Sequence, residues 1–189
     1  MGKDLADMTK EELWELFPII LTEHREIWAQ WYAEERERLA EYLPPGKLHI
    51  HHIGSTAIQG IWAKPIIDIL VEIPVGQAWE EIKLRIIRSG YLCMSETEDR
   101  ASFNRGYTPE GFADRVFHLH LRRAGDHAEL YFRDYLNERP ALAKQYEALK
   151  LSLREKYEHD RDAYTGAKAE FVTTHTAAAR RHYGARYGA

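Results

Sequence analysis

The residues best suited to chemistry lie in one stretch, from His52 to Ile73, which reads HIGSTAIQGIWAKPIIDILVEI. The Gly54-Ser55 pair follows an alternating apolar pattern, and glycine at such a turn lets the backbone approach a ligand closely. The Ser55 hydroxyl and the exposed N–H groups of the turn are suited to holding phosphate oxygens. A purely structural turn of the same composition is the alternative interpretation, and the pattern alone does not decide between the two.

Asp68 interrupts an isoleucine-rich run, 65–73, that is typical of a buried strand. A carboxylate in such a strand is costly unless it is paired or binds a cation. The alternatives are therefore a cation site and a buried salt bridge with Lys64 or an arginine. Lys64 also suits a phosphate, because Pro65 holds it extended at the strand entry. Glu72 shares the strand face of Asp68 but lies roughly 13 Å away by strand rise, so the two acids are not expected to bind one ion.

His118 and His120 share one face of a predicted strand, because side chains two residues apart point the same way. This spacing can present two imidazoles to a metal or to a phosphate. A polar pair on a solvated face is the alternative. Among the other histidines, His52 precedes the turn and is placed to orient it, whereas His49 and His51 are expected to be exposed strand residues.

Other charged and aromatic residues are weaker candidates. Arg105 and Arg115 lie near predicted strand ends, and surface charge is the better interpretation of both. Lys150 and Lys168 fall on predicted helices, where solvated lysines are far commoner than phosphate ligands. Trp62 lies in the loop between the turn and the strand, where it could stack on a base or a sugar.

The composition bounds the class of protein. The chain has 189 residues, of which 44% are hydrophobic and 30% charged, as in an ordinary globular domain. A formal net charge of −4 gives no general attraction to DNA or to an anionic membrane, so neither partner is expected. Cys93 is the single cysteine, the first residues are acidic, and no apolar run approaches a membrane span. We therefore expect a cytoplasmic protein, and the sequence does not predict its oligomeric state.

Hydrophobic periodicity predicts helices on both sides of a sheet-forming segment. A capping box at Thr9 and Glu12 opens the first helix, and Pro18 ends it. A second helix is expected over 23–42, with the charges at 34–38 on a solvated face. The predicted strands are 47–54, 65–73, 91–95, 101–107 and 116–121, and the later helices are 79–89, 128–137, 140–159 and 163–183. This order is typical of an α+β fold in one domain, residues 1–189, with 1–25 as an N-terminal helical extension.

The stretch HIGSTAIQGIWAKPIIDILVEI resembles the signature of the GrpB (UPF0157) family of bacterial proteins. The resemblance continues through HLHL at His118–Leu121 and FRDYLNERP at Phe132–Pro140, and it covers about Ile27 to Phe171. That family resembles the nucleotidyltransferase superfold. The resemblance therefore implies an α+β fold with a nucleotidyltransferase-like mixed β-sheet, flanking helices and a helical C-terminal part.

Enzymes of that superfold have a Gly-Ser turn, then a strand with two acids one residue apart, and a third acid on a later strand. These acids bind two divalent cations that position a nucleoside triphosphate. In this chain one acid of the pair is missing, because the partner position of Asp68 falls on Ile66 or Leu70. Histidines occupy the strand of the third acid, unless Asp114 or Glu129 serves.

Three sets of site residues follow from the turn, the strand and the resemblance. Ser55 and Asp68 are predicted to be catalytic. A divalent metal, Mg²⁺ or Mn²⁺, is predicted to bind Asp68, His118 and His120. The predicted nucleotide-binding residues are Gly54, Ser55, Thr56 and Lys64.

The sequence leaves three functions open. The first is a metal-dependent nucleotidyl- or phosphoryl-transferase that acts on a small molecule or a protein. The second is a non-catalytic module that binds a nucleotide or a metabolite, which the missing acid favours. The third is a protein that associates with partners through its helices, which ranks last because it leaves the buried Asp68 unexplained.

Overall fold

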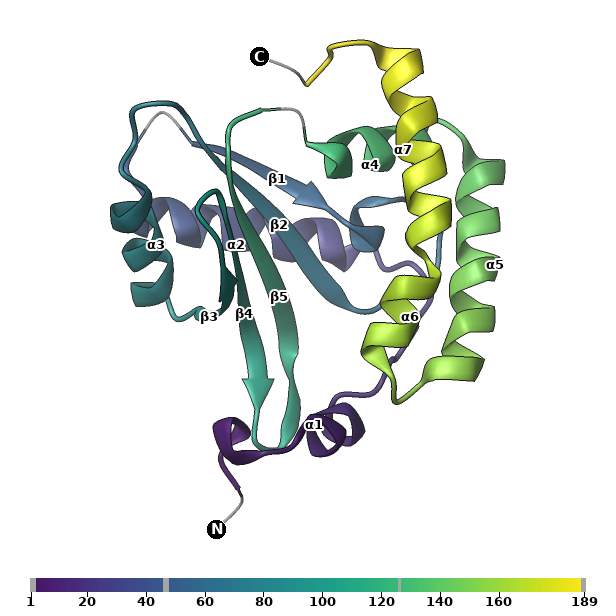
Figure 1. Cartoon of the computed structure of the whole chain (residues 1–189), viewed down its shortest axis with the longest axis horizontal. Coiled ribbons are helices and arrows are strands. Elements are labelled where there is room, and N and C mark those ends of the chain that lie inside the picture. The colour runs from purple at the N-terminus through teal and green to yellow at the C-terminus, as the bar shows by residue number, and fades with distance from the viewer. Residues whose placement is uncertain (1–2, 46–47, 126, 188–189) are drawn as a thin grey trace.

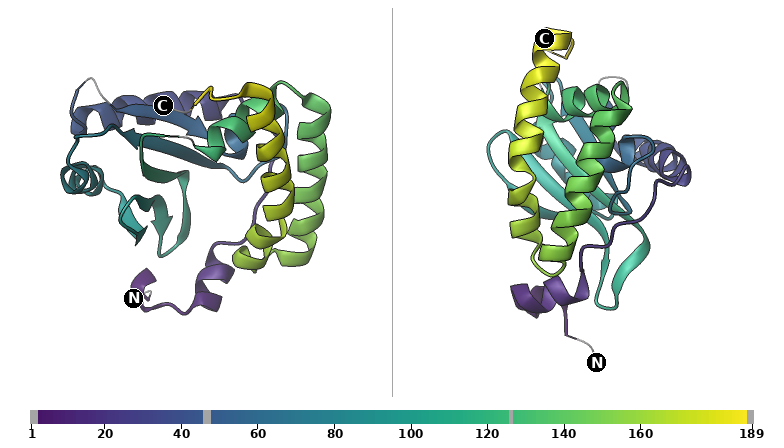
Figure 2. Two further views of the ribbon diagram at one scale, coloured as in Figure 1. Left: turned by 45° about the horizontal axis from the view of Figure 1, so that its top comes forward. Right: turned by 90° about the vertical axis from the view of Figure 1, so that its right-hand side faces the viewer.

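The computed structural model describes residues 3–45, 48–125 and 127–187, and it places a sheet between two groups of helices (Figures 1 and 2). In chain order the elements are the 3-10 helix η1 (Leu5–Asp7), α1 (Lys10–Leu16), α2 (Ile27–Tyr42), β1 (His49–Ile53), the 3-10 helix η2 (Ser55–Ala57), β2 (Ile66–Ile73), α3 (Trp79–Arg88), β3 (Leu92–Glu96), β4 (Arg100–Thr108), β5 (Gly111–Arg123), α4 (Ala128–Asn137), α5 (Pro140–Tyr157), α6 (Arg161–Ala167) and α7 (Ala169–Tyr183).

The sheet is mixed, with the strand order β1-β2-β5-β4-β3. Strands β2 and β5 pair in parallel, and the other neighbours pair antiparallel. The parallel register sets Asp68 opposite His118 and Leu70 opposite His120. On the other side of β2, Ile53 lies opposite Asp68. Asp68 is therefore flanked by paired strands on both sides, one residue from the turn that follows β1.

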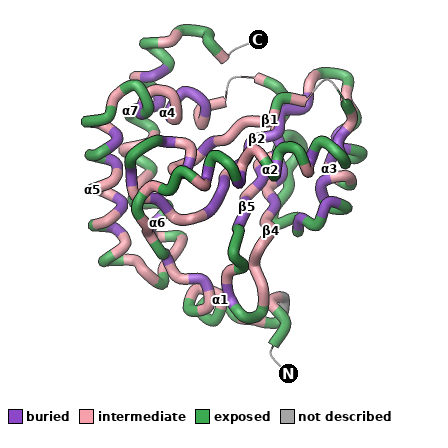
Figure 3. Tube along the Cα trace, turned by 180° about the vertical axis from the view of Figure 1, so that it is seen from behind, coloured by how far each residue is buried: buried purple, intermediate pink, exposed green. Residues whose placement is uncertain are grey.

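Alternation along the strands separates a hydrophobic face from a polar face. The apolar residues of β2, such as Ile67, Ile69 and Val71, join the main core, to which α2 and α3 contribute Trp28 and Trp79. Residues in the opposite phase face α4 and the C-terminal helices. Figure 3, seen from the α2 side, shows buried residues concentrated along β2 and β5. The core therefore holds the strands rigidly while one face stays available for polar chemistry.

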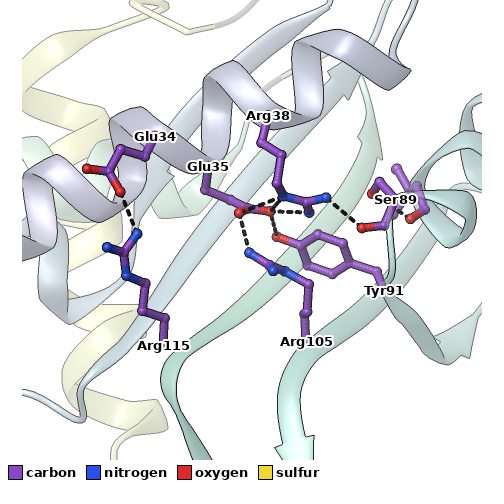
Figure 4. A network of polar contacts seen from close by, with 8 residues as sticks. Glu34, Glu35, Arg38, Ser89, Tyr91, Arg105 and Arg115 are labelled. Carbon is purple, nitrogen blue, oxygen red and sulfur yellow. Dashed lines mark hydrogen bonds and ion pairs between the residues drawn. The ribbon is translucent and has the colours of Figure 1, made fainter.

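Helix α2 is held to the sheet by a buried carboxylate (Figure 4). Glu35 is only 3% exposed and receives hydrogen bonds from the Arg38 guanidinium, the Tyr91 hydroxyl at 2.9 Å and Arg105. The expectation that the charges at 34–38 form a solvated face is therefore wrong for Glu35. Arg105, expected at the surface, is the partner on β4 that makes this burial possible.

The predicted α+β class with a mixed sheet is confirmed, and most boundaries fall within a few residues of the predicted ones. One helix prediction was wrong. The segment expected as one helix over 163–183 is two helices, α6 and α7, which meet at Lys168. Within the described residues, no helix is both long and apolar enough to span a membrane.

Replacing Glu35 by alanine tests the anchor of α2. Loss of the buried carboxylate leaves the half-buried Arg38 and Arg105 guanidinium groups without their counter-charge, so Glu35→Ala is expected to lower the free energy of unfolding by about 1.5–3 kcal/mol. Glu34→Ala is the matched control, because Glu34 pairs with Arg115 on the exposed surface and should contribute little. Urea unfolding of both variants measures the difference, and equal losses would contradict the role given to Glu35.

Candidate functional site

The turn after β1 brings the backbone directly against Asp68. Gly54 adopts a φ of 71°, and a Cβ atom placed there would lie 2.2 Å from Asp68 Oδ2. Glycine is therefore required twice, once by the left-handed backbone and once by the close approach. The 3-10 helix η2 follows at once and carries Ser55 and Thr56 past the carboxylate. The turn predicted from Gly54-Ser55 thus forms one wall around Asp68.

Asp68, His118 and His120 converge on the polar face of β2 and β5. Asp68 Oδ1 lies 3.4 Å from His118 Nδ1 and 3.4 Å from His120 Nε2. Burial alone would raise the pKa of Asp68, but hydrogen bonds from the two imidazoles outweigh it and hold that pKa well below its usual range. Asp68 is therefore a carboxylate that stays ionised. The ionisable side chains closest to Asp68 are therefore the two imidazoles. The sequence had offered Lys64 or an arginine as its partner.

A chain of hydrogen bonds leads from helix α6 to this carboxylate. Arg161 donates to the Tyr107 hydroxyl at 3.1 Å, and that hydroxyl lies 2.7 Å from His118 Nε2. Burial lowers the pKa of His118, which keeps the imidazole neutral. A neutral His118 that accepts from Tyr107 at Nε2 must carry its proton at Nδ1, facing Asp68. Arg161, Tyr107 and His118 thus donate in turn toward the carboxylate. This order places the proton of His118 on Nδ1.

A cavity of about 400 Å³ opens beside Asp68, between the turn and helices α5, α6 and α7. Its charged lining is strongly cationic, with Lys64, Lys150, Arg161 and Lys168. Asp162 also lines it, but that side chain is exposed and forms an ion pair with Lys10 at 2.6 Å. The cavity therefore gathers four basic side chains around the half-buried carboxylate of Asp68.

The lysines of the cavity crowd one another. Burial, together with the charges of Lys168 and Arg161, lowers the pKa of Lys64 to about 7. Burial and the charge of Lys168 likewise lower the pKa of Lys150 to about 7, and burial lowers the pKa of Lys168 itself. Lys150 is only 2% exposed and donates to the Trp62 carbonyl. A group of cations held in this way favours an anion as its counter-charge.

Aromatic rings support these cations. The Lys64 and Lys168 ammonium groups lie 5.6 Å and 4.5 Å from the centroid of the buried Tyr164 ring. Lys150 lies 4.8 Å from the centroid of the Tyr146 ring, where cation–π attraction compensates part of the desolvation. Burial raises the pKa of Tyr146 to about 12, so its phenol stays neutral. The tyrosines thus fix lysine positions without adding charge.

The predicted nucleotide-binding residues differ in how free their polar groups are. Gly54, Ser55, Thr56 and Lys64 all line the cavity. The Thr56 hydroxyl, however, already donates to the Ile66 carbonyl at 3.1 Å and lies 3.0 Å from His52 Nε2. Burial lowers the pKa of His52 to about 4, so the imidazole that contacts the Thr56 hydroxyl is neutral. The Thr56 hydroxyl is therefore already engaged within the protein.

The donor set does not match the two-cation site of the nucleotidyltransferase superfold. The positions of the missing acid, Ile66 and Leu70, are both buried apolar residues. Neither alternative third acid lines the cavity, because Asp114 and Glu129 belong to other surface pockets. A single cation on Asp68, His118 and His120, the predicted Mg²⁺ or Mn²⁺ site, stays a prediction.

Several residues in or beside the cavity were not predicted from the sequence. Lys150 and Lys168 were expected to be solvated, and no sequence pattern pointed to Arg161 or Tyr107. The lysines and Arg161 reach the site only because the C-terminal helices pack against the turn, and Tyr107 reaches it only through the β4–β5 hairpin. Trp62 contributes its backbone to Lys150 and Glu147, and it is not among the residues that line the cavity.

Comparison with solved structures defines the class of fold. A crystal structure of the Cid1 poly(U) polymerase with bound MgGTP matches 71% of this chain and 43% of its own, with a TM-score of 0.50 and 11% identity. That degree of likeness shows a shared nucleotidyltransferase-like fold and nothing of the substrate.

The chain belongs to the GrpB family, whose model, described as GrpB protein, matches residues 18–178. The crystal structure of conserved protein GrpB from Enterococcus faecalis has a TM-score of 0.74 and 30% identity, over 87% of this chain and 99% of that one. The UPF0157 protein YqkA of Bacillus subtilis is 35% identical over 154 residues, which cover 80% of this chain. The match spans 44% of that relative, less than half of its length.

Two glycine substitutions test the contact between the turn and Asp68. Gly54→Ala forces a side chain into the carboxylate, and Gly60→Ala is the control, because Gly60 also has a φ of 71° but no atom within 4 Å of its Cβ position. Backbone strain costs both variants about 1–3 kcal/mol. The additional clash should make Gly54→Ala clearly the less stable in thermal unfolding. Equal melting temperatures would show that the turn does not press on Asp68.

Proposed function

We propose that the cavity binds a nucleoside triphosphate, or another small molecule with a chain of phosphates. The observation that carries the proposal is the group of Lys64, Lys150, Arg161 and Lys168, which outnumbers the two acids, Asp68 and Asp162, that line the same cavity. Phosphate oxygens are suitable counter-charges for such a group. The volume of the cavity, about 400 Å³, lies within the range of small-molecule sites.

The turn supports the same ligand. Gly54 and Ser55 lie at the N-terminal end of the 3-10 helix η2 and line the cavity. Backbone N–H groups and a hydroxyl in such a turn suit a phosphate. The Cid1 poly(U) polymerase, which shares this fold, has MgGTP bound in its crystal structure. In this chain one acid of the usual pair is replaced by an apolar residue and the opposite wall is cationic. We therefore propose that lysine and arginine carry much of the charge neutralisation that cations provide in two-metal enzymes.

Nucleotidyl or phosphoryl transfer is a second candidate function. The observation that favours it is the ionised Asp68 carboxylate, fixed at the cavity by His118, His120 and the chain from Arg161. Such a carboxylate suits the binding of a divalent cation or the orientation of an acceptor hydroxyl on a small molecule or protein. A screen for nucleotide turnover with Mg²⁺ or Mn²⁺ tests this, and turnover that survives in Asp68→Asn would exclude a role for Asp68.

Removing one cavity lysine should weaken triphosphate binding. Each charged hydrogen bond contributes about 1.5–3 kcal/mol, so Lys168→Met and Lys150→Met are expected to raise the dissociation constant for ATP and for tripolyphosphate about tenfold or more. Lys156→Met, at an exposed position of α5, is the control. Isothermal titration calorimetry gives the constants.

Stability measurements separate a binding effect from unfolding. Because burial lowers the pKa of Lys168, replacing it by methionine removes an unfavourable charge and should leave the melting temperature unchanged or higher. The proposal fails if the wild-type protein binds neither ATP nor tripolyphosphate, with or without a divalent cation.

The lowered lysine pKa values predict the pH dependence of binding. With pKa values near 7, Lys64 and Lys150 lose their charge as the pH rises from about 6 to about 9 in the free protein. A bound phosphate chain stabilises the charged form and raises both pKa values, so binding takes up protons and tightens as the pH falls over this range. Calorimetry in buffers of different ionisation enthalpy counts those protons, and a pH-independent affinity without proton uptake would contradict the assignment.

A further inference from the structure

A second group of polar side chains lies on the same face of the sheet, near the other end of β2. The register of β1 and β2 sets His49 opposite Glu72 and His51 opposite Leu70. His49, His51 and Glu72 share one face, because the two histidines are two residues apart and Glu72 points the same way. His51 Nε2 lies 2.6 Å from Glu72 Oε2, and His49 Nδ1 lies 3.7 Å from the same oxygen.

A third imidazole reaches the same carboxylate from another element. His127 immediately precedes α4, and its Nε2 lies 3.1 Å from Glu72 Oε1. That nitrogen is buried and is not in hydrogen-bond geometry with any partner. Three imidazoles thus surround one carboxylate, with two nitrogens at one oxygen and the third at the other. Glu72 itself is 6% exposed, so the carboxylate lies at the bottom of the cluster.

The spacing of these donors suits a metal ion. Of the residues that the structure describes, His49, His51 and Glu72 form a group whose donor atoms all lie within 4.8 Å of one another. Two or three imidazoles with one carboxylate are a donor set that Zn²⁺ and similar transition metals favour. Proteins orient a metal-binding acid through a hydrogen bond to its second oxygen, and His127 Nε2 lies within reach of that oxygen, at 3.1 Å.

From this geometry we propose that His49, His51 and Glu72 bind a Zn²⁺-like divalent transition metal, with His127 positioning Glu72. The ion takes the place of the direct contact between His51 Nε2 and Glu72 Oε2. It links the edge strand β1 to β2 and, through His127, to the start of α4. The graded exposure, from 72% for the His49 side chain to 9% for that of Glu72, leaves one side open to solvent or to a further ligand.

This site is distinct from the cavity around Asp68. Asp68 and Glu72 are four residues apart on β2, roughly 13 Å by strand rise. Between them Leu70 packs with Ile53 and Leu130 as a separate apolar cluster, which insulates one polar group from the other. The metal proposal therefore does not depend on the nature of the ligand in the cavity.

Cobalt titration of the full chain without a purification tag tests the proposal. Co²⁺ in a site with histidine nitrogens and few ligands gives visible absorption bands, and Zn²⁺ displaces it, so competition yields both affinities. His49→Ala and Glu72→Gln should weaken Co²⁺ binding about tenfold or more, and His127→Ala should weaken it to a smaller degree. The control is His159→Ala, which removes an exposed histidine 3.7 Å from the Glu15 carboxylate.

Asp68→Asn distinguishes the two clusters. If the proposal is correct, His159→Ala binds Co²⁺ as the wild-type protein does, and Asp68→Asn keeps the ion that His49→Ala loses, whether or not a second ion binds at Asp68. Loss of that ion in Asp68→Asn with retention in His49→Ala would overturn it, as would the absence of saturable wild-type binding below millimolar metal. Since His49 is exposed, its substitution decides the question even if Glu72→Gln does not fold.

Discussion

The half-buried carboxylate of Asp68, which lies in a paired, isoleucine-rich strand, is the constraint on which the arrangement of the site depends. A charge in this position is tolerated only if its oxygens are satisfied. Here two imidazoles contact one of those oxygens, because His118 and His120 both face Oδ1. That solution fixes the register of β5 beside β2, since a shift by one residue would turn both imidazoles into the core. It also requires glycine at position 54, where no side chain fits.

Because imidazoles rather than lysines contact Asp68 most closely, the basic side chains of the cavity are available for another anion. Lys64, Lys150 and Lys168 are held on tyrosine rings and repel one another, which is unfavourable in the absence of a counter-charge. Evolved sites commonly hold charges in such unfavourable positions where a ligand must be bound. The same face of the sheet carries a second carboxylate surrounded by imidazoles, Glu72, which lies close to three of them. Two charged centres thus share one strand, separated by a layer of apolar side chains.

Much of the fold was predictable from sequence, because it rests on periodic patterns and on local signals. The capping box at Thr9, the helix over 128–137 and the strand that carries Asp68 were all predicted closely. The break at Lys168 was not, because the apolar periodicity continues past Gly166, the one local signal that weakens the helix there. The turn and Asp68 were visible because a glycine beside a strand and an acid within one are locally unusual.

Contacts between distant elements were not visible in the sequence. Glu35 looked like one of several helix-surface charges, and only the position of Arg105 on β4 shows that it is buried. Lys150 and Lys168 looked like ordinary helical lysines until packing turned them toward the turn. His49 and His51 were expected to be exposed, and the antiparallel register with Glu72 is what gives them a common partner. The sequence therefore indicated which side chains could do chemistry, but the contacts that each side chain makes depended on tertiary packing.

The cavity wall from α5 to α7 has a consequence for the order in which the protein becomes competent during synthesis. Gly54 and Asp68 leave the ribosome long before Arg161 and Lys168, which lie on or after α6. A contact between residues so far apart forms late, because the intervening chain must be ordered first. A nascent chain that ends within α5 already contains the turn, the acid and both histidine strands, yet it lacks the wall that would retain a phosphate. The phosphate ligand proposed above would therefore meet the assembled site only after α5 and α6 have docked against the turn.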